Sequence, residues 1–145
     1  MRDTKLGEEN LRELIAGTDY VVDCIDDVPA KLLLANYCRE QKIPLIMCMG
    51  TGNRLSSEGL RIANFDRTEG CPLAKKMRLL LKNARFRKVR CLYSDSPVTP
   101  AFPIEDGGKR TVGSISYVPT IAGLKLAEHV INRILKEETS LDIPK

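Results

Sequence analysis

The sequence predicts an α/β fold in which helices flank a mostly parallel sheet that allows antiparallel additions. The first sign is alternation, because a β-rich run at residues 20–25 precedes a helical pattern at 30–41 and a nearly all-apolar run at 43–49. Strands that are apolar throughout are typical of parallel sheets covered on both faces. The second sign is size, since 145 residues with 43% hydrophobic side chains suffice for one buried core.

Turn and cap residues divide the chain into its other elements. Pro29 and Pro72 fall where the first turn of a helix tolerates proline, and Asp26 or Asp27 can act as the N-cap before Pro29. The expected strands lie at residues 20–25, 43–49, 60–65, 88–93 and 114–118. The expected helices lie at residues 10–16, 30–41, 71–84 and 120–137, the first being the end of a short helix.

The last expected helix has two kinds of side chain at helical spacing. One face is expected to be apolar, with Leu124, Ala127, Ile131, Ile134 and Leu135. The other is expected to be polar, with Lys125, His129, Asn132, Arg133 and Lys136, and His129 on this face is expected to be solvated.

Several classes of protein are excluded by composition. The longest apolar run, at 43–49, is broken by Pro44 and is far shorter than the roughly 20 residues that span a bilayer. No apolar segment follows Met1, so we expect no secretory signal, no membrane association and a cytoplasmic location. Five cysteines without a C-x-x-C pair, together with a single histidine, predict neither a disulfide framework nor a zinc site.

An acidic cluster, D-C-I-D-D at residues 23–27, ends the first expected strand. Open α/β sheets bind ligands at the carboxyl ends of their strands, where a carboxylate can hold magnesium on the phosphates of a nucleotide. Position 26 lies past the strand, where the backbone turns toward that crevice, so we expect Asp26 rather than Asp23 to face the nucleotide. The alternative is that these carboxylates only cap the following helix.

The loop M-G-T-G-N-R at residues 49–54 follows the second expected strand. Its two glycines would let the backbone approach a ligand, and Asn53 or Arg54 could reach polar groups on it. A plain turn is the alternative. The loop is not a phosphate-binding G-x-G-x-x-G, and neither that motif nor a Walker-type loop occurs in the chain.

The basic residues are unevenly distributed along the chain. Between Gly70 and Ser94 there is no acidic residue, although the whole chain has a formal net charge of only +4. The eight basic residues of this segment are Lys75, Lys76, Arg78, Lys82, Arg85, Arg87, Lys88 and Arg90. Such a surface attracts phosphate backbones, and the alternative is an ordinary solvated helix face.

Cys71 precedes Pro72 at the start of the basic helix. The helix dipole and nearby Lys75 could lower the pKa of its thiol, which would suit a nucleophile. A small buried or capping thiol is the alternative.

Four stretches of the sequence together resemble a known family. They are Y-V-V-D-C-I-D-D-V-P-A-K at 20–31, I-P-L-I-M-C-M-G-T-G-N-R-L at 43–55, C-P-L-A-K-K-M-R at 71–78 and G-S-I-S-Y-V-P-T-I-A-G-L-K-L-A at 113–127. In this order they resemble the second half of the ThiF/MoeB/HesA-type, ubiquitin-activating-like adenylating enzymes. Within that superfamily they look most like the tRNA threonylcarbamoyladenosine dehydratase branch.

The resemblance implies an ATP-dependent, homodimeric enzyme on a Rossmann-like sheet, which attaches AMP to a carboxyl-type oxygen. In the dehydratase branch the substrate is the threonyl carboxylate of a modified adenosine beside the tRNA anticodon, and attack within the same side chain closes a ring. Asp26 matches the family aspartate that holds magnesium and the nucleotide phosphates. The expected nucleotide contacts are Asp26, Asp27, Lys31, Asn53 and Arg54, and the expected tRNA contacts are Lys75, Lys76, Arg78, Lys82, Arg85 and Lys88.

The sequence departs from the family in one large respect. The family's glycine-rich ATP loop and the Arg and Lys that follow it precede the matched region, so residues 1–145 are expected to be a C-terminal portion that does not adenylate alone. One alternative is an activator of a ubiquitin-like sulfur-carrier protein, within a sulfur relay, although such relatives commonly carry two C-x-x-C zinc pairs that this sequence lacks. A second alternative is a non-catalytic dimerisation or RNA-binding remnant.

Overall fold

A four-stranded sheet organises the structure, which is a computed structural model describing residues 3–81, 86, 88–99 and 112–141. The strands are β1 (Val21–Asp23), β2 (Leu45–Cys48), β3 (Leu60–Asn64) and β4 (Arg90–Ser94). The helices are α1 (Glu8–Ile15), α2 (Val28–Gln41), α3 (Pro72–Leu80) and α4 (Tyr117–Leu141), with a short 3₁₀ turn, η1 (Phe65–Arg67), after β3.

The strand order is β1-β2-β4-β3. Strands β1, β2 and β4 are parallel, whereas β3 runs antiparallel to β4 at the edge of the sheet. The predicted α/β class, with a mostly parallel sheet and an antiparallel addition, is therefore confirmed. In register, Asp23 of β1 lies beside Met47 of β2, which lies beside Cys91 of β4.

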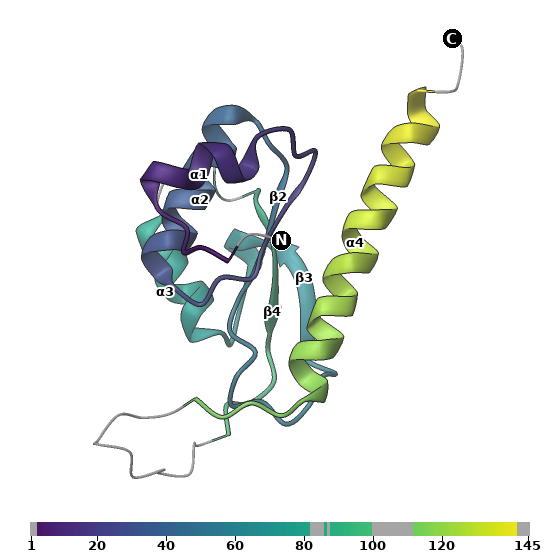
Figure 1. Cartoon of the computed structure of the whole chain (residues 1–145). Coiled ribbons are helices and arrows are strands. Elements are labelled where there is room, and N and C mark those ends of the chain that lie inside the picture. The colour runs from purple at the N-terminus through teal and green to yellow at the C-terminus, as the bar shows by residue number, and fades with distance from the viewer. Residues whose placement is uncertain (1–2, 82–85, 87, 100–111, 142–145) are drawn as a thin grey trace.

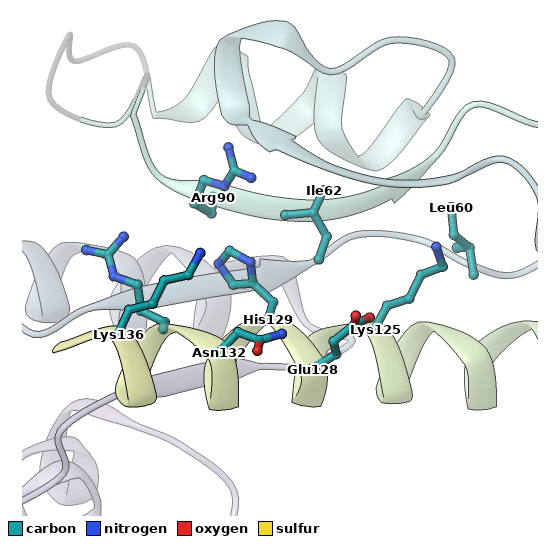
Figure 2. Close-up of a pocket in the computed structure, with 9 residues that line it drawn as sticks. Leu60, Ile62, Arg90, Lys125, Glu128, His129, Asn132 and Lys136 are labelled. Atoms are coloured by element: carbon teal, nitrogen blue, oxygen red, sulfur yellow. The ribbon is translucent and has the colours of Figure 1, made fainter. Parts of the chain in front are cut away.

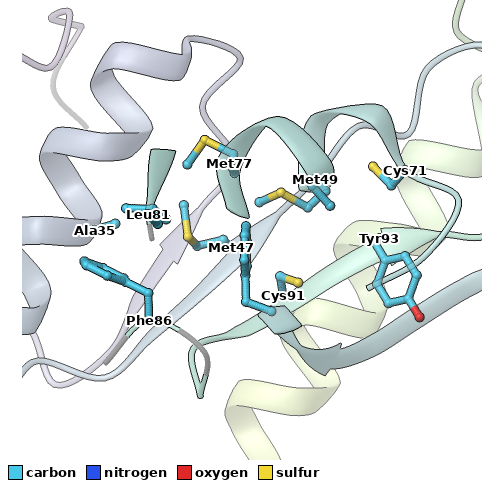
Figure 3. Close-up of a cluster of buried hydrophobic side chains, with 11 residues drawn as sticks. Ala35, Met47, Met49, Cys71, Met77, Leu81, Phe86, Cys91 and Tyr93 are labelled. Carbon is cyan, nitrogen blue, oxygen red and sulfur yellow. The ribbon is translucent and has the colours of Figure 1, made fainter. Parts of the chain in front are cut away.

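Helices cover both faces of the sheet (Figure 1): α1, α2 and α3 lie on one face and α4 on the other. Ile46 and Met47 are both fully buried although consecutive strand residues point to opposite faces. Met47 joins the core beneath α2 and α3, which Figure 3 shows, and Ile46 joins the smaller core beneath α4. The apolar run at 43–49 thus contains a central strand that is buried on both faces, as predicted.

The helix starts follow the predicted cap positions. Asp27 is the N-cap of α2, with Pro29 in the first turn, but its side chain makes no capping hydrogen bond. Cys71 is the N-cap of α3, again with proline in the first turn. Helix α3 ends at Leu80 instead of residue 84, and residues 82–85 lie outside the described part of the chain.

The predicted strand at residues 114–118 is wrong, because α4 already begins at Tyr117. Two turn contacts start the helix: the Val118 N–H donates to the Ile115 carbonyl at 3.2 Å, and the Thr120 hydroxyl donates to the Ser116 carbonyl at 2.6 Å. Pro119 falls in the first helical turn, where its missing N–H costs no intrahelical bond. The β-branched residues here therefore lie at a helix start.

Helix α4 packs on the sheet through side chains other than the apolar face expected from the sequence. Val118, Ala122 and Leu126, spaced four residues apart, are the side chains that it buries. Leu124, Ile131 and Leu135, which belong to the expected apolar face, are 66%, 57% and 54% exposed. The helix carries two apolar stripes, and the one with the smaller residues packs closely on the sheet. His129, expected to be solvated, is half-buried.

Within the described part of the chain, no helix is both long enough and apolar enough to cross a membrane.

Packing in the larger core predicts a large effect of truncating Met77. Met77 of α3 is fully buried in that core, whereas Leu79 in the same helix is 58% exposed. Met77→Ala should lower the free energy of unfolding by about 2–5 kcal/mol, because a cavity remains. Leu79→Ala, the matched control, should change it by about 0.5 kcal/mol or less. Urea unfolding curves measure both, and equal losses would contradict this packing.

Candidate functional site

A cavity of about 560 Å³ lies at the carboxyl ends of β1 and β2. Its walls come from six parts of the chain: the turn after β1, Lys31 of α2, the end of β2 with the loop after it, the start of α3, Val98 after β4, and residues near 112–114. The sequence-predicted residues that line it are Asp26, Lys31, Asn53, Arg54 and Cys71. Ligand crevices of open α/β sheets form at this edge.

A buried ion pair supports the floor of this cavity. The Lys31 ammonium lies 2.9 Å from the Asp23 carboxylate, and both residues are only 1% exposed. Lys31 also donates to the Cys48 carbonyl at 2.8 Å, and the second Asp23 oxygen accepts the Ile25 N–H at 2.9 Å. The Lys31 ammonium, predicted to contact the nucleotide, is therefore bound to Asp23 and Cys48 and ties α2 to the ends of β1 and β2.

Asp26 is the open carboxylate of the cavity. It is exposed and lines the cavity, and it makes no hydrogen bond or ion pair with any described residue. Asp27, at the N-cap of α2, is half-buried and does not line the cavity. The two acidic residues after β1 thus differ in position, and Asp26 is the one available to a ligand or a cation.

Arg54 presents an unsatisfied donor in the same cavity. Its side chain is almost completely buried, at 4% exposed, and one guanidinium nitrogen donates to the Gly70 carbonyl at 3.0 Å. The other terminal nitrogen, Nη1, is buried without a hydrogen-bond partner among the described residues. A buried unpaired donor costs about 1–3 kcal/mol, and more for a charged group. Oxyanions are the natural partners of a guanidinium, so this nitrogen favours a phosphate or carboxylate ligand.

Asn53 holds the loop after β2 in place. Its backbone is left-handed, with φ of 54°, and its side-chain oxygen accepts the Gly113 N–H at 2.8 Å. The Asn53 N–H donates to the Gly113 carbonyl, also at 2.8 Å. A Cβ at Gly52 would clash with Cγ1 of Val112 and lie 3.3 Å from that carbonyl oxygen, so a side chain there would force Val112 to shift. The Asn53 oxygen predicted to bind a ligand instead fixes the segment that closes the cavity.

Cys71 lies at the start of α3 and at the wall of the cavity. It is 5% exposed and packs in the core with Met49 and Ala74, and its carbonyl accepts the Lys75 N–H at 3.0 Å. Cys71 is therefore a small buried residue at a helix cap, which is the alternative to a nucleophile that the sequence left open.

A pair of cysteines at the cavity was not predicted as functional. Cys24 and Cys48 both line it, and the register of β1 and β2 brings them side by side one residue past Asp23 and Met47. The hydrogen bond from the Cys48 thiol lowers the pKa of Cys24 to about 7, against the opposing effects of burial and Asp23. The same hydrogen bond, with burial, raises the pKa of Cys48. Knowledge of the strand register would have been needed to find this pair.

The basic segment is only partly described. Lys75 and Lys76 of α3 and Lys88 before β4 are exposed. The Arg78 guanidinium donates to the carbonyl and hydroxyl of Thr68, so this side chain is held against the protein. Lys82, Arg85 and Arg87 lie outside the described residues.

The cavity offers few side chains that could bind a metal ion. In the described ranges, no group of three or more His, Cys, Asp or Glu side chains could hold one. Magnesium commonly uses one or two carboxylates together with the phosphates of a nucleotide. Asp26 fits that second arrangement, because its open carboxylate shares the cavity with Arg54, whose free nitrogen suits a phosphate.

Residues 1–143 match the ThiF family, and the chain therefore belongs to that family. The tRNA threonylcarbamoyladenosine dehydratase of Bacillus subtilis (strain 168) is 31% identical to the chain over 137 residues, which are 83% of this chain and 52% of that protein. The family that the sequence motifs predicted is thus confirmed.

Solved structures of one relative share the fold. The E. coli tRNA N6-threonylcarbamoyladenosine dehydratase TcdA, in complex with AMP, matches with a TM-score of 0.77 at 27% identity. Its complex with ATP matches with a TM-score of 0.78 at 26% identity. Each match covers 91% of this chain and 55% or 54% of TcdA. The chain thus spans about half the length of the relatives that it matches.

The cysteine pair predicts an unusual pH profile. Iodoacetamide reacts with thiolates, so alkylation of Cys24 should rise with pH through a midpoint near 7 instead of 9.0. Cys38 and Cys91 should stay slow, because burial raises their pKa values to about 11 and about 12. Peptide mass spectrometry measures the rates. Cys48→Ala removes the donor and should move the Cys24 midpoint upward, and an unchanged midpoint would contradict the pairing.

Proposed function

We propose that this chain works in the ATP-dependent adenylation and dehydration of threonylcarbamoyladenosine in tRNA. The observation that supports this most is the juxtaposition of the open Asp26 carboxylate and the unpaired Arg54 nitrogen in one cavity. One group suits a cation and the other an oxyanion, which is what a site for a magnesium-bound phosphate needs. The names of the relatives, and the ATP and AMP held by TcdA, agree with this chemistry.

The reaction joins two steps. An oxygen of the threonyl carboxylate attacks the α-phosphorus of ATP, so that a bond to AMP forms and pyrophosphate leaves. A nucleophile in the same side chain then attacks the activated carbonyl carbon, and AMP leaves with the carboxyl oxygen. The net change is closure of a ring with loss of one water, driven by the cleavage of ATP.

The residues of the cavity would act by stabilising negative charge on the phosphate oxygens. Arg54 Nη1 would donate to a phosphate oxygen as negative charge develops on it, at a position fixed by the bond from its other nitrogen to Gly70. Asp26 would hold magnesium, which neutralises phosphate oxygens. Lys31 would act indirectly, by holding Asp23 and the backbone of Cys48 beneath the ligand.

We propose that the phosphate-binding glycine-rich loop comes from polypeptide outside these 145 residues, since no such motif occurs within them. We further propose tRNA contacts at Lys75, Lys76 and Lys88, whose side chains are exposed, and a cytoplasmic location, where tRNA is found. A homodimer is supported by Leu124, Ile131 and Leu135, which leave an apolar stripe of α4 exposed.

Deletion of the gene in its own organism tests this function. Mass spectrometry of tRNA nucleosides should show the uncyclised threonylcarbamoyladenosine replacing the cyclised form. Re-expression of the wild-type gene should restore the cyclised form. Asp26→Asn should leave it at the level of the deletion strain, because the cation site loses its charge.

Asp19→Asn is the matched control. Asp19 is exposed just before β1, at the opposite end of the strand from the cavity, and this change should restore cyclisation fully. Immunoblots must show equal amounts of both variants. Cyclised nucleoside in the deletion strain at the wild-type level would contradict the function, and full rescue by Asp26→Asn would contradict the role of Asp26.

A further inference from the structure

A second and larger cavity lies on the other face of the sheet. It has a volume of about 720 Å³ and runs between α4 and the strands β3 and β4. Figure 2 shows Lys125, His129 and Lys136 extending from α4 toward the sheet, with Leu60 and Ile62 on the strand opposite. No residue of this cavity takes part in the site at the carboxyl edge.

The lining of this cavity is strongly basic. Arg90, Lys125, Arg133 and Lys136 contribute four positive charges, and Glu128 contributes the single negative one. Lys125 and Lys136 make no hydrogen bond or ion pair with any residue that the structure describes. Burial, with the nearby charges of Arg90 and Arg133, lowers the pKa of His129. These charges would be stabilised by an anionic partner.

The basic surface continues past the cavity. A smaller cavity of about 270 Å³ is also lined by Arg90 and Arg133, and it adds Arg39 and Lys88. Lys88 belongs to the basic segment recognised in the sequence, so that segment meets α4 at the start of β4. We call the two cavities together the α4 groove.

The length of the α4 groove indicates what it binds. Lys125 and Lys136 are eleven residues apart on one helix, which corresponds to about 16 Å along the axis. A single phosphate or a diphosphate cannot contact charges spread over that distance. A phosphodiester backbone can, because it carries one charge at every nucleotide.

We propose that the α4 groove binds the phosphate backbone of RNA. The inference rests on the proposed function for its choice of RNA as the polyanion, and it names a surface of the protein that holds the body of the tRNA away from the nucleotide cavity. Because the contacts are made to phosphates, they fix the position of the RNA and do not read its sequence.

Binding of fluorescent tRNA by the 145-residue chain, measured by anisotropy over a range of salt concentrations, tests the proposal. The variant Lys125→Gln/Lys136→Gln should bind several-fold more weakly, and the slope of log Kd against log salt should fall by about 1 to 2. Lys5→Gln/Arg12→Gln is the matched control, since it removes two exposed positive charges near α1, on the other face of the sheet. The control should retain nearly wild-type affinity and slope. Both variants should melt at the wild-type temperature.

Three results would overturn the proposal. The first is unchanged tRNA binding in Lys125→Gln/Lys136→Gln, and the second is an equal loss in the control, which would indicate a general effect of net charge. The third uses inorganic pyrophosphate: if it binds the wild type and not the groove variant while tRNA binding is unchanged, the ligand is a small phosphorylated molecule. Cyclisation of tRNA in cells is measured separately. RNA binding at the α4 groove can therefore be contradicted while the proposed function holds, and the proposed function can be contradicted while RNA binding holds.

Discussion

The buried ion pair between Asp23 and Lys31 is the interaction on which the cavity at the carboxyl edge of the sheet depends. It joins the end of β1 to the first turns of α2, and the bond from Lys31 to the Cys48 carbonyl adds the end of β2. Two charges in a fully buried place are stable only when each has its partner and its remaining hydrogen bonds. The pair therefore fixes where the turn after β1 leaves the sheet, and with it the position of Asp26.

The structure has two cavities with different charge. At the carboxyl edge, Asp23 and Lys31 neutralise each other, whereas the exposed Asp26 carboxylate and the buried Nη1 of Arg54 have no partner among the described residues. On the α4 face, basic side chains outnumber the single acidic one, Glu128. The first arrangement suits a nucleotide with its cation, and the second suits a polyanion. The two cavities share no lining residue, so a polyanion in the α4 groove would not compete with a nucleotide at the carboxyl edge.

Much of the sheet and of its flanking helices could be predicted, because the sequence patterns that indicate them lie within short segments of the chain. The apolar run around Ile46 and Met47 indicated a strand buried on both faces, and Pro29 and Pro72 marked two helix starts correctly. The orientation of α4 could not be predicted, because its two apolar stripes differ only in how closely they fit the sheet. The contact between Cys24 and Cys48 depends on strand register, and the burial of Lys31 depends on Asp23 across a turn. Both contacts depend on the tertiary structure, which the hydrophobic periodicity of the sequence does not reveal.

A double-mutant cycle on Asp23 and Lys31 tests this account most directly. Asp23→Leu and Lys31→Met each leave one buried charge without its partner, and each should lower the free energy of unfolding by about 3–5 kcal/mol. The double variant leaves no buried charge, so its loss should be far smaller than the sum of the two single losses. Urea unfolding of the four proteins gives the coupling energy. Additive losses would show that the two side chains do not stabilise each other, and the ion pair would not be what holds the cavity in place.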